Sequence, residues 1–285
     1  GDDLVSVSAS VGDVSQTGLQ NGAWSWSFTP DDGPSDGQTI TIDADDGDDA
    51  GNVVFTLVVN NVAPTAGIAL TDARVPVVKG IPVEFILEAA DASQADQQAG
   101  FVYDINWDDG TMATTAPGQP DGLVLSHRFE AAGALGVVVT ATDKDGGRSD
   151  IFTLYVNVIQ PVDVDVKPGN DQNNVNVKSQ GVIPVAIYTT ADFDAATING
   201  ATVRLAGVAA EQFALEDVDG DGDLDMILHF RTQEVLDALG LDPENSESAQ
   251  VQVELTGETI DEVMLQGFDM IDFFLPGNSG AKGKK

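Results

Sequence analysis

Apolar residues alternate with small or polar residues along most of the chain, in short runs separated by glycine, aspartate and proline. An alternation with a period of two places successive side chains on opposite faces of a β-strand. Before residue 63 the runs are Leu4–Ala9, Trp24–Phe28, Thr39–Ile42 and Val53–Val59. Because turn residues separate short strands at this spacing, the pattern favours an antiparallel sandwich.

The alternation resumes after Asn60–Thr65, a proline-stopped segment that we interpret as a linker. Five runs follow: Val83–Ala89, Phe101–Trp107, Val124–Phe129, Gly136–Thr142 and Ile151–Val158. Trp107 is expected to fill the core of this second sandwich.

Beyond Pro161 the pattern predicts a third β domain. Met226–Phe230 is typical of a buried strand, and Thr232–Leu239 has helical spacing that ends at Gly240. Further strands are predicted at 250–256, 261–265 and 269–275. The sequence thus predicts an all-β chain of β-sandwiches, the last with one short helix, in three domains at 1–62, 63–159 and 160–285.

A nine-residue loop in the third domain carries an acidic residue at every odd position. Such close carboxylates repel one another unless a cation lies among them. Calcium takes six to eight oxygen ligands, and a loop with oxygens at alternate positions and glycine at the sixth wraps around it. We expect carboxylate ligands and one backbone carbonyl, the latter from Asp223, with the turn at Gly222. Leu228 stands where a helix-loop-helix calcium site has glutamate. The alternative is a solvated acidic turn. The candidate ligands are Asp217, Asp219, Asp221, Asp223 and Asp225.

Two other acidic groups are weaker candidates. A second calcium could be held in the first domain, where the irregular spacing equally suits a solvated hairpin. A third could lie between domains, where the acids also suit turns. The first group is Asp43, Asp45, Asp46 and Asp48; the second is Asp91, Asp143 and Asp145.

Three segments carry family resemblances. Asn21–Pro30, Asp31–Pro34 and Val58–Thr65 resemble a bacterial immunoglobulin-like repeat of large secreted and surface proteins. In that family one or two more strands precede the segment equivalent to Gly1–Leu4. A sandwich without them buries little apolar surface and leaves an unpaired edge. Either the chain was cut from a longer one or a strand from a neighbouring molecule fills the gap.

The middle domain is similar to a polycystic kidney disease (PKD) domain through Tyr103–Gly110, Ser126–Phe129 and Thr140–Gly147. That resemblance implies a spacer or a contact module for protein or polysaccharide. The segments Val162–Asp171 and Asn174–Tyr188, together with the acidic loop, resemble a C-terminal β module of secreted bacterial proteins. This resemblance implies fold and calcium binding rather than a defined activity.

Composition narrows the function further. The 47 acidic and 12 basic residues give a formal net charge of -35, so nucleic acid is an unfavourable partner. Cysteine is absent, which excludes disulfides and leaves bound calcium as a cross-link. No apolar run is long enough to span a bilayer. A start at Gly1 without a signal-peptide pattern suggests a processed or excised piece. The nine residues 277–285 form a basic tail that an acidic neighbouring subunit would hold.

Catalytic motifs are not recognisable in the sequence. There is no nucleophile elbow, metalloprotease motif, phosphate loop or dinucleotide fingerprint. His127 and His229 lie in strand patterns and are expected to be structural. Trp24 and Trp26 share one face of a strand, where core packing is favoured over a sugar-stacking platform. We therefore do not expect an enzyme.

The sequence predicts a calcium-stabilised extracellular protein of a bacterial surface or matrix, with a structural or adhesive role. Its partners would be copies of itself, joined by strand complementation into a filament, or neighbouring domains of a longer chain. The alternative is a non-catalytic accessory region of a larger secreted hydrolase, whose middle domain contacts polysaccharide.

Overall fold

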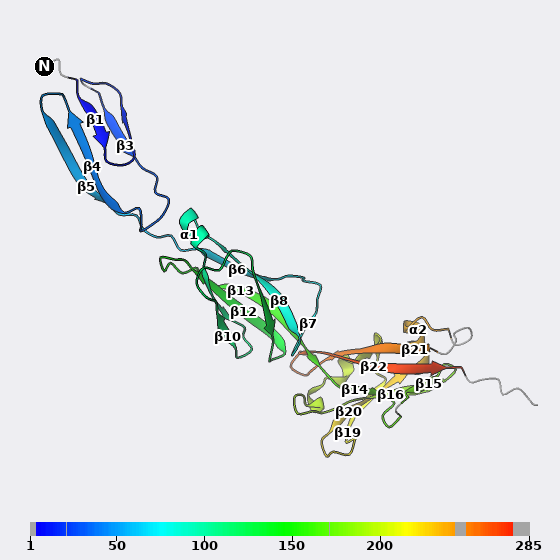
Figure 1. The fold of residues 1–285 in the computed structure, drawn as a ribbon. Coiled ribbons are helices and arrows are strands. Elements are labelled where there is room, and N and C mark those ends of the chain that lie inside the picture. Colours follow the sequence, from blue (N-terminus) through cyan, green and yellow to red (C-terminus); the bar gives the residue numbers. More distant parts are fainter. Residues whose placement is uncertain (1–3, 21, 171, 243–248, 276–285) are drawn as a thin grey trace, which may run out of the picture. The chain divides into compact units, whose positions relative to one another are not determined.

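The computed structural model describes residues 4–20, 22–170, 172–242 and 249–275. Within these residues the protein is all-β, as predicted, and has two short α-helices where one was predicted (Figure 1). It divides into two compact units, which are described separately. The first comprises the described residues of Gly1–Asp72, Glu84–His127 and Gly136–Leu154; the second comprises those of Ala73–Val83, Arg128–Leu135 and Tyr155–Lys285. The three-domain boundaries stay a prediction, and the basic tail lies outside the described residues.

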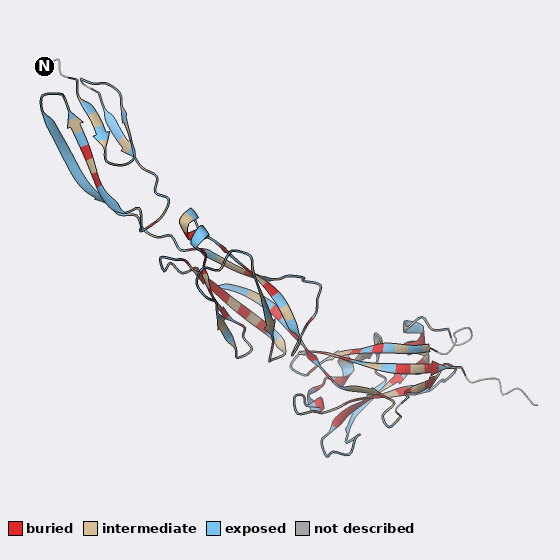
Figure 2. Ribbon diagram, in the orientation of Figure 1, coloured by how far each residue is buried: buried red, intermediate tan, exposed pale blue. Residues whose placement is uncertain are grey.

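The first unit begins with two small antiparallel sheets. One has the order β1 (Ser6–Ala9), β4 (Gln38–Asp45), β5 (Ala50–Leu57), and the other pairs β2 (Asp13–Gln16) with β3 (Trp24–Ser27). Strand β2 was not predicted, because its four residues carry a single large apolar side chain. Figure 2 shows β5 exposed along most of its length.

The rest of the first unit is a larger sandwich. One sheet has the order β11 (Leu123–Arg128), β8 (Pro82–Ala90), β6 (Thr65–Leu70), and the facing sheet contains β10 (Met112–Thr114), β9 (Val102–Asn106) and β12 (Gly133–Thr142). In β9 and in much of β12, buried residues alternate with more exposed ones. Trp107 is 3% exposed and packs against Phe85, so the prediction that it fills the core is confirmed.

Helix α1 (Gln94–Ala99) was missed from the sequence. Its six residues are too few to display an apolar period, and three of them are glutamine. Ser93 caps it, since Oγ accepts a hydrogen bond from the backbone N–H of Asp96. The helix therefore follows from a local cap rather than from an amphipathic pattern.

The second unit packs two sheets around one apolar core. The first contains β22 (Met264–Phe274) with β15 (Asn174–Asn176), β21 (Ala249–Glu258), β17 (Arg204–Leu205) and β18 (Val208–Ala209). Strand β13 (Phe152–Pro161), which pairs with β7 (Val77–Val78), continues this sheet through β22, but neither β13 nor β7 contributes a residue to the core. The second has the order β14 (Val164–Val166), β16 (Val182–Ile187), β20 (Asp225–Arg231), β19 (Gln212–Glu216). Helix α2 (Thr232–Ala238) contributes buried Val235 and Leu236 to the core.

The predicted buried strand and short helix are both present, as β20 and α2. The two strands predicted at 261–265 and 269–275 are wrong as separate elements. Residues 261–263 form the turn after β21, and one strand, β22, runs on from Met264 to Phe274. The alternation of apolar residues predicted which side chains of this strand face the core, but it could not show that the strand continues across Gly267. Glycine is needed at this position because an added Cβ would lie 2.4 Å from Val164 Cγ2.

Candidate metal centres

The acidic loop predicted to bind calcium connects the antiparallel strands β19 and β20. Gly220 and Gly222 have φ of 81° and 102°, a left-handed conformation that suits glycine. The structure brings carboxylate oxygens of Asp217, Asp219 and Asp225 within 4.8 Å of one another. We call these residues, with Asp221 and Asp223, the β19–β20 loop.

Hydrogen bonds within the loop point the backbone toward the carboxylates. Asp217 Oδ1 accepts from Gly220 N at 2.8 Å, Asp219 Oδ1 from Asp221 N at 3.1 Å, and Asp221 Oδ1 from Asp223 N at 2.9 Å. These bonds use one oxygen of each carboxylate. Asp221 and Asp223 are exposed and lie outside the converging group.

Asp225 anchors the loop to the second unit. It is 1% exposed, and its two oxygens accept from Thr189 N and Val218 N, each at 2.9 Å. Nearby, Tyr188 donates to Asp165 Oδ2 at 2.8 Å. Burial, and then this bond to Asp165, raises the pKa of the Tyr188 phenol. The loop thus combines exposed carboxylate oxygens with one fixed, buried carboxylate. An all-oxygen set of ligands of this kind fits calcium.

The first-domain candidates lie on a hairpin. Asp43 is in β4, and Asp45 Oδ1 accepts from Gly47 N at 2.7 Å in the turn to β5. Asp46 Oδ1 accepts from Asp48 N and Asp49 N at 3.1 and 2.7 Å, and these bonds lower the Asp46 pKa. Among the described residues these four acids do not form a converging group of three. A second calcium here stays a prediction, while the turn bonds account for the acids locally.

The third set of candidates is divided between two groups in the first unit. Asp91 follows β8 and Asp143 follows β12, and both converge with Asp96 of α1 within 4.8 Å. Asn61, in the segment before β6, donates from Nδ2 to Asp143 Oδ2 at 2.8 Å. We call Asn61, Asp91, Asp96 and Asp143 the linker cluster.

Several oxygens of the linker cluster are buried without a hydrogen-bond donor. They are Asn61 Oδ1, Asp91 Oδ2 and both carboxylate oxygens of Asp96, whose residue is 0% exposed. Asp96 Oδ1 lies 3.2 Å from Lys144 Nζ, an ion pair without hydrogen-bond geometry. Burial raises the pKa of Asp96 above its ordinary value. These features distinguish the cluster from a solvated turn, whose acids are exposed.

Asp145 belongs to the other group. Lys144 Nζ lies 2.8 Å from Asp32 Oδ2 and also contacts Asp145 Oδ2 and Asp96. The hydrogen bond to Asp145, and then that to Asp32, raises the Lys144 pKa, and the Lys144 bond is the main cause of the lowered Asp32 pKa. Ser93 Oγ also donates to Asp32 Oδ1 at 3.1 Å. We call Asp32, Asp96, Asp145 and Lys144 the lysine group.

Asn61, Asp96 and Asp32 were not predicted as site residues from the sequence. Ser93 and Asp96 stand three apart, a spacing typical of helix starts, but the pattern does not reveal that the acid is buried. Asp32 reaches the lysine group from a loop 64 positions before Asp96 in the sequence. Its approach depends on Gly33, where a Cβ would lie 2.4 Å from Asn60 O.

An apolar groove lies on the N-terminal sheets. Its volume is about 290 Å³, and Trp24 of β3 and Val53 of β5 are 48% and 58% exposed in it. Trp26 instead packs edge-on against Phe55 and donates from Nε1 to Val11 O at 2.6 Å. One tryptophan therefore packs internally and the other borders the groove. Its lining is Val7, Trp24, Ile42, Ala44, Gly51, Asn52 and Val53.

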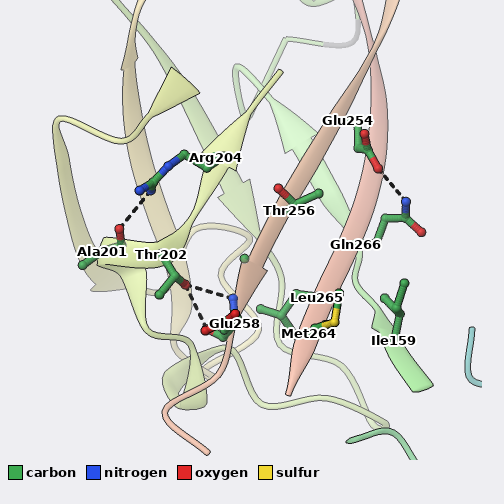
Figure 3. A pocket seen from close by; sticks show the side chains of 11 residues that line it. Ile159, Ala201, Thr202, Arg204, Glu254, Thr256, Glu258, Met264, Leu265 and Gln266 are labelled. Atoms are coloured by element: carbon green, nitrogen blue, oxygen red, sulfur yellow. Dashed lines mark hydrogen bonds between the residues drawn. The ribbon is translucent and has the colours of Figure 1, made fainter. Parts of the chain in front are cut away.

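A cavity of about 550 Å³ lies on the second unit over β21 and β22 (Figure 3). Its polar side chains bond to neighbours: Gln266 Nε2 donates to Glu254 Oε1 at 2.5 Å, and Arg204 donates to Ala201 O at 2.9 Å. Ile159 and Met264 supply apolar lining. Of the described buried polar atoms that lack a partner, none lines this cavity. It therefore shows no convergent set of groups awaiting a ligand.

The two histidines occupy structural positions. His127 stacks on Trp107 with ring centroids 3.9 Å apart, and its Nε2 lies 2.9 Å from Asp109 Oδ2. His229 is a half-buried residue of β20 paired with Pro184 and Gln212. These contacts fit the expectation that both are structural.

Comparisons with known proteins give similarity of fold only. No family model and no curated protein matches the sequence. Among solved structures, the PKD domain of a peptidase from a Thermoplasmatales archaeon is 20% identical, with a TM-score of 0.29, covering 34% of this chain and 97% of its own. An I-band fragment of titin is 9% identical, with a TM-score of 0.36 and coverages of 96% and 88%. Domains of a bacterial ice-binding adhesin are 16% identical, with a TM-score of 0.27 and coverages of 84% and 74%.

Proposed function

We propose that this chain is a calcium-stabilised extracellular protein with a structural or adhesive role on a bacterial surface or in a matrix. The observation that carries the proposal is the convergence of Asp217, Asp219 and Asp225 in a chain of net charge -35. An ion among these carboxylates removes their repulsion and fixes the β19–β20 loop. Calcium supplies cross-linking in a protein that has no cysteine. Among the described residues no helix is long and apolar enough to cross a membrane.

Thermal unfolding with and without calcium tests this proposal. An ion that binds the folded state alone raises the unfolding midpoint by mass action. The double variant Asp217→Asn/Asp219→Asn should lose part of that rise, while Asp237→Asn, an exposed acid on α2, should keep it. Equal midpoints in calcium and in chelator for the unmodified chain would contradict a structural ion.

A second element of the proposal is strand complementation between copies of the chain, which would join them into a filament. It is supported by the apolar groove beside Trp24 and Val53 and by β5, whose single partner in the described sheet is β4. An added strand would satisfy the free backbone groups of β5 and cover the exposed side chains. The occupant would present an alternating apolar face to the groove.

Sedimentation velocity over a concentration series tests self-association. The unmodified chain should form species larger than the monomer, and Val53→Glu should shift it to monomer because the glutamate would be buried in an apolar groove. Val75→Glu, which changes a residue that is 50% exposed away from the groove, is the matched control. Monomer at every concentration for the unmodified chain would exclude the filament.

The alternative function is a polysaccharide-contacting accessory region of a larger secreted hydrolase. The half-exposed Trp24 is the feature that favours it, because an exposed indole face can stack on a sugar ring. Glycan binding that Trp24→Ala abolishes, in a chain that stays monomeric, would support this function over the filament.

A further inference from the structure

We propose that the linker cluster binds one divalent cation of the calcium type through Asn61, Asp91, Asp96 and Asp143, and that Lys144 keeps a second ion out of the adjoining carboxylates. This site lies apart in sequence from the β19–β20 loop. The inference deepens the proposed function and rests on it only for the identity of the ion. Its ligands come from a connecting segment, a strand end, a short helix and a turn.

The spacing of the carboxylates suits a single ion. Oxygens of Asp91, Asp96 and Asp143 all lie within 4.8 Å of one another. Because calcium–oxygen distances are about 2.3–2.6 Å, two ligands on opposite sides of one ion are about 5 Å apart. The three carboxylates can therefore reach the same ion with little movement.

The unpartnered buried oxygens indicate that something positive belongs among them. Asp96 is fully buried and its Oδ2 has no donor, while Asp91 Oδ2 and Asn61 Oδ1 also lack one. Lys144 pairs with Asp96 Oδ1 but leaves Asp96 Oδ2, Asp91 Oδ2 and Asn61 Oδ1 without a donor, and buried polar oxygens without partners are unfavourable. One proton on Asp96 would relieve that residue alone. A cation would satisfy all of these oxygens together.

The other hydrogen bonds orient the ligands rather than saturate them. Asp91 Oδ1 accepts from Ser93 N at 2.8 Å, which leaves Oδ2 without a donor. Asp143 Oδ1 accepts from Asp145 N and Gly147 N at 2.9 and 2.8 Å. Asn61 donates to Asp143, and its Oδ1 remains unpartnered. This is the supporting shell that holds metal ligands in place.

The donor types select a hard cation. Three carboxylates and one amide oxygen form an all-oxygen set, which suits calcium or magnesium rather than zinc. Magnesium keeps several waters and is usually held by one or two carboxylates. Three carboxylates converging from separate backbone segments therefore favour calcium.

Lys144 limits the linker cluster and the adjoining carboxylates to one bound ion. Asp32, Asp96 and Asp145 also converge within 4.8 Å, and the Lys144 ammonium lies among them. Asp96 belongs to both groups: its Oδ1 pairs with the Lys144 ammonium, and its Oδ2 has no donor and is available to the cation. Without Lys144 these carboxylates would offer a second place for an ion.

Calorimetric titration of the chelator-treated full chain with calcium chloride tests both parts. The background variant Asp217→Asn/Asp219→Asn removes ligands of the β19–β20 loop. In this background we expect one calcium per chain, and none after Asp96→Asn or Asp91→Asn. The control Asp150→Asn, an exposed acid of the same unit, should still bind one. An unchanged stoichiometry in Asp96→Asn and Asp91→Asn would overturn the site.

A stability readout separates ion binding from a merely structural role. Asp96→Asn replaces a buried, donor-poor carboxylate by a neutral group of the same shape, so in chelator its unfolding midpoint should equal or exceed that of the background. A lower midpoint in chelator, together with an unchanged calcium stoichiometry, would show that Asp96 only pairs with Lys144 and would overturn its assignment as a ligand.

Lys144→Met tests the second part. In the same background it should raise the stoichiometry from one calcium to two. A count that stays at one, or falls to zero, would overturn the role of Lys144 in excluding an ion. The failure of the β19–β20 loop as a calcium site would appear separately, as equal stoichiometry in the unmodified chain and the background variant.

Discussion

Asn61 and Asp143 are 82 positions apart in the sequence, and the Asn61 Nδ2 amide donates a 2.8 Å hydrogen bond to Asp143 Oδ2. The bond ties the segment that precedes β6 to the end of β12. It also leaves Asn61 Oδ1 buried without a donor. One side chain thus supports a proposed metal ligand and supplies a candidate ligand of its own.

Two variants of Asn61 should reverse their order of stability between chelator and calcium. Asn61→Ala removes a hydrogen bond worth about 0.5–1.5 kcal/mol of stability. Asn61→Asp adds a charge beside Asp143, so in chelator it should be the less stable of the two. In calcium the order should reverse, because aspartate restores an oxygen ligand. Urea unfolding in both conditions measures this, and the same order in both would contradict a metal role for Asn61.

Glycine is required at position 147 because the side chains of Asn61 and Asp143 lie close to its backbone. A Cβ there would lie 2.4 Å from Asp143 Oδ2 and 2.5 Å from Asn61 Nδ2. Gly147→Ala should therefore destabilise the first unit by about 1–3 kcal/mol, the usual range for overpacking, and weaken calcium binding. Gly51→Ala, where nothing lies within 4 Å of the added carbon, is the control and should change stability little. Similar unfolding midpoints for the two variants in urea would refute the steric argument.

The contrast between Asp143 and Asp96 shows what the sequence could predict. Asp143 begins an acidic turn after a strongly alternating strand, so its position at a strand end was predictable from local pattern. Asp96 lies in a helix of six residues, and its burial depends on packing against segments far away in sequence. Strand alternation likewise predicted β20 and β12, whereas β2 and β10 have too few residues to display a period.

Tyr103 should make the first unit sensitive to alkaline pH. It is fully buried, and its hydroxyl donates to Pro120 O at 3.2 Å. Burial, with smaller effects from Asp121 and Glu88, raises its pKa from 10.0 to about 12. The folded state therefore holds this proton more tightly than the unfolded chain. Its contribution to stability is complete below pH 10 and is lost as the pH rises toward 12.

Urea unfolding from pH 9 to pH 12 measures this loss in Tyr103→Phe and in the unmodified chain. At pH 9 the variant should be less stable by about 1 kcal/mol, the usual value of one hydrogen bond. Its disadvantage should shrink or reverse toward pH 12, because phenylalanine cannot ionise. Tyr155→Phe, at a residue that is 83% exposed, should track the unmodified chain throughout. Parallel pH curves for Tyr103→Phe and the unmodified chain would contradict the raised pKa.

Alanine substitutions of Asp225 and Asp217 should cost different amounts of stability in chelator, but both should reduce the stabilisation by calcium. Asp225→Ala leaves the N–H groups of Thr189 and Val218 without their acceptor in a buried site. Each unsatisfied group costs about 1–3 kcal/mol, so the loss in chelator should be about 2–6 kcal/mol. Asp217 is exposed and accepts from Gly220 N, so Asp217→Ala should cost less than about 1 kcal/mol.

Both variants should reduce the stabilisation that calcium gives, because each removes a carboxylate of the converging group. Urea unfolding with calcium and with chelator separates the two effects, and Asp223→Asn, outside that group, serves as the loop control. If Asp225→Ala reduced the stabilisation by calcium but Asp217→Ala did not, ion binding would depend on the fold around Asp225 rather than on the carboxylates of the β19–β20 loop. If both variants lost the same stability in chelator, the anchoring role of the buried Asp225 hydrogen bonds would be wrong.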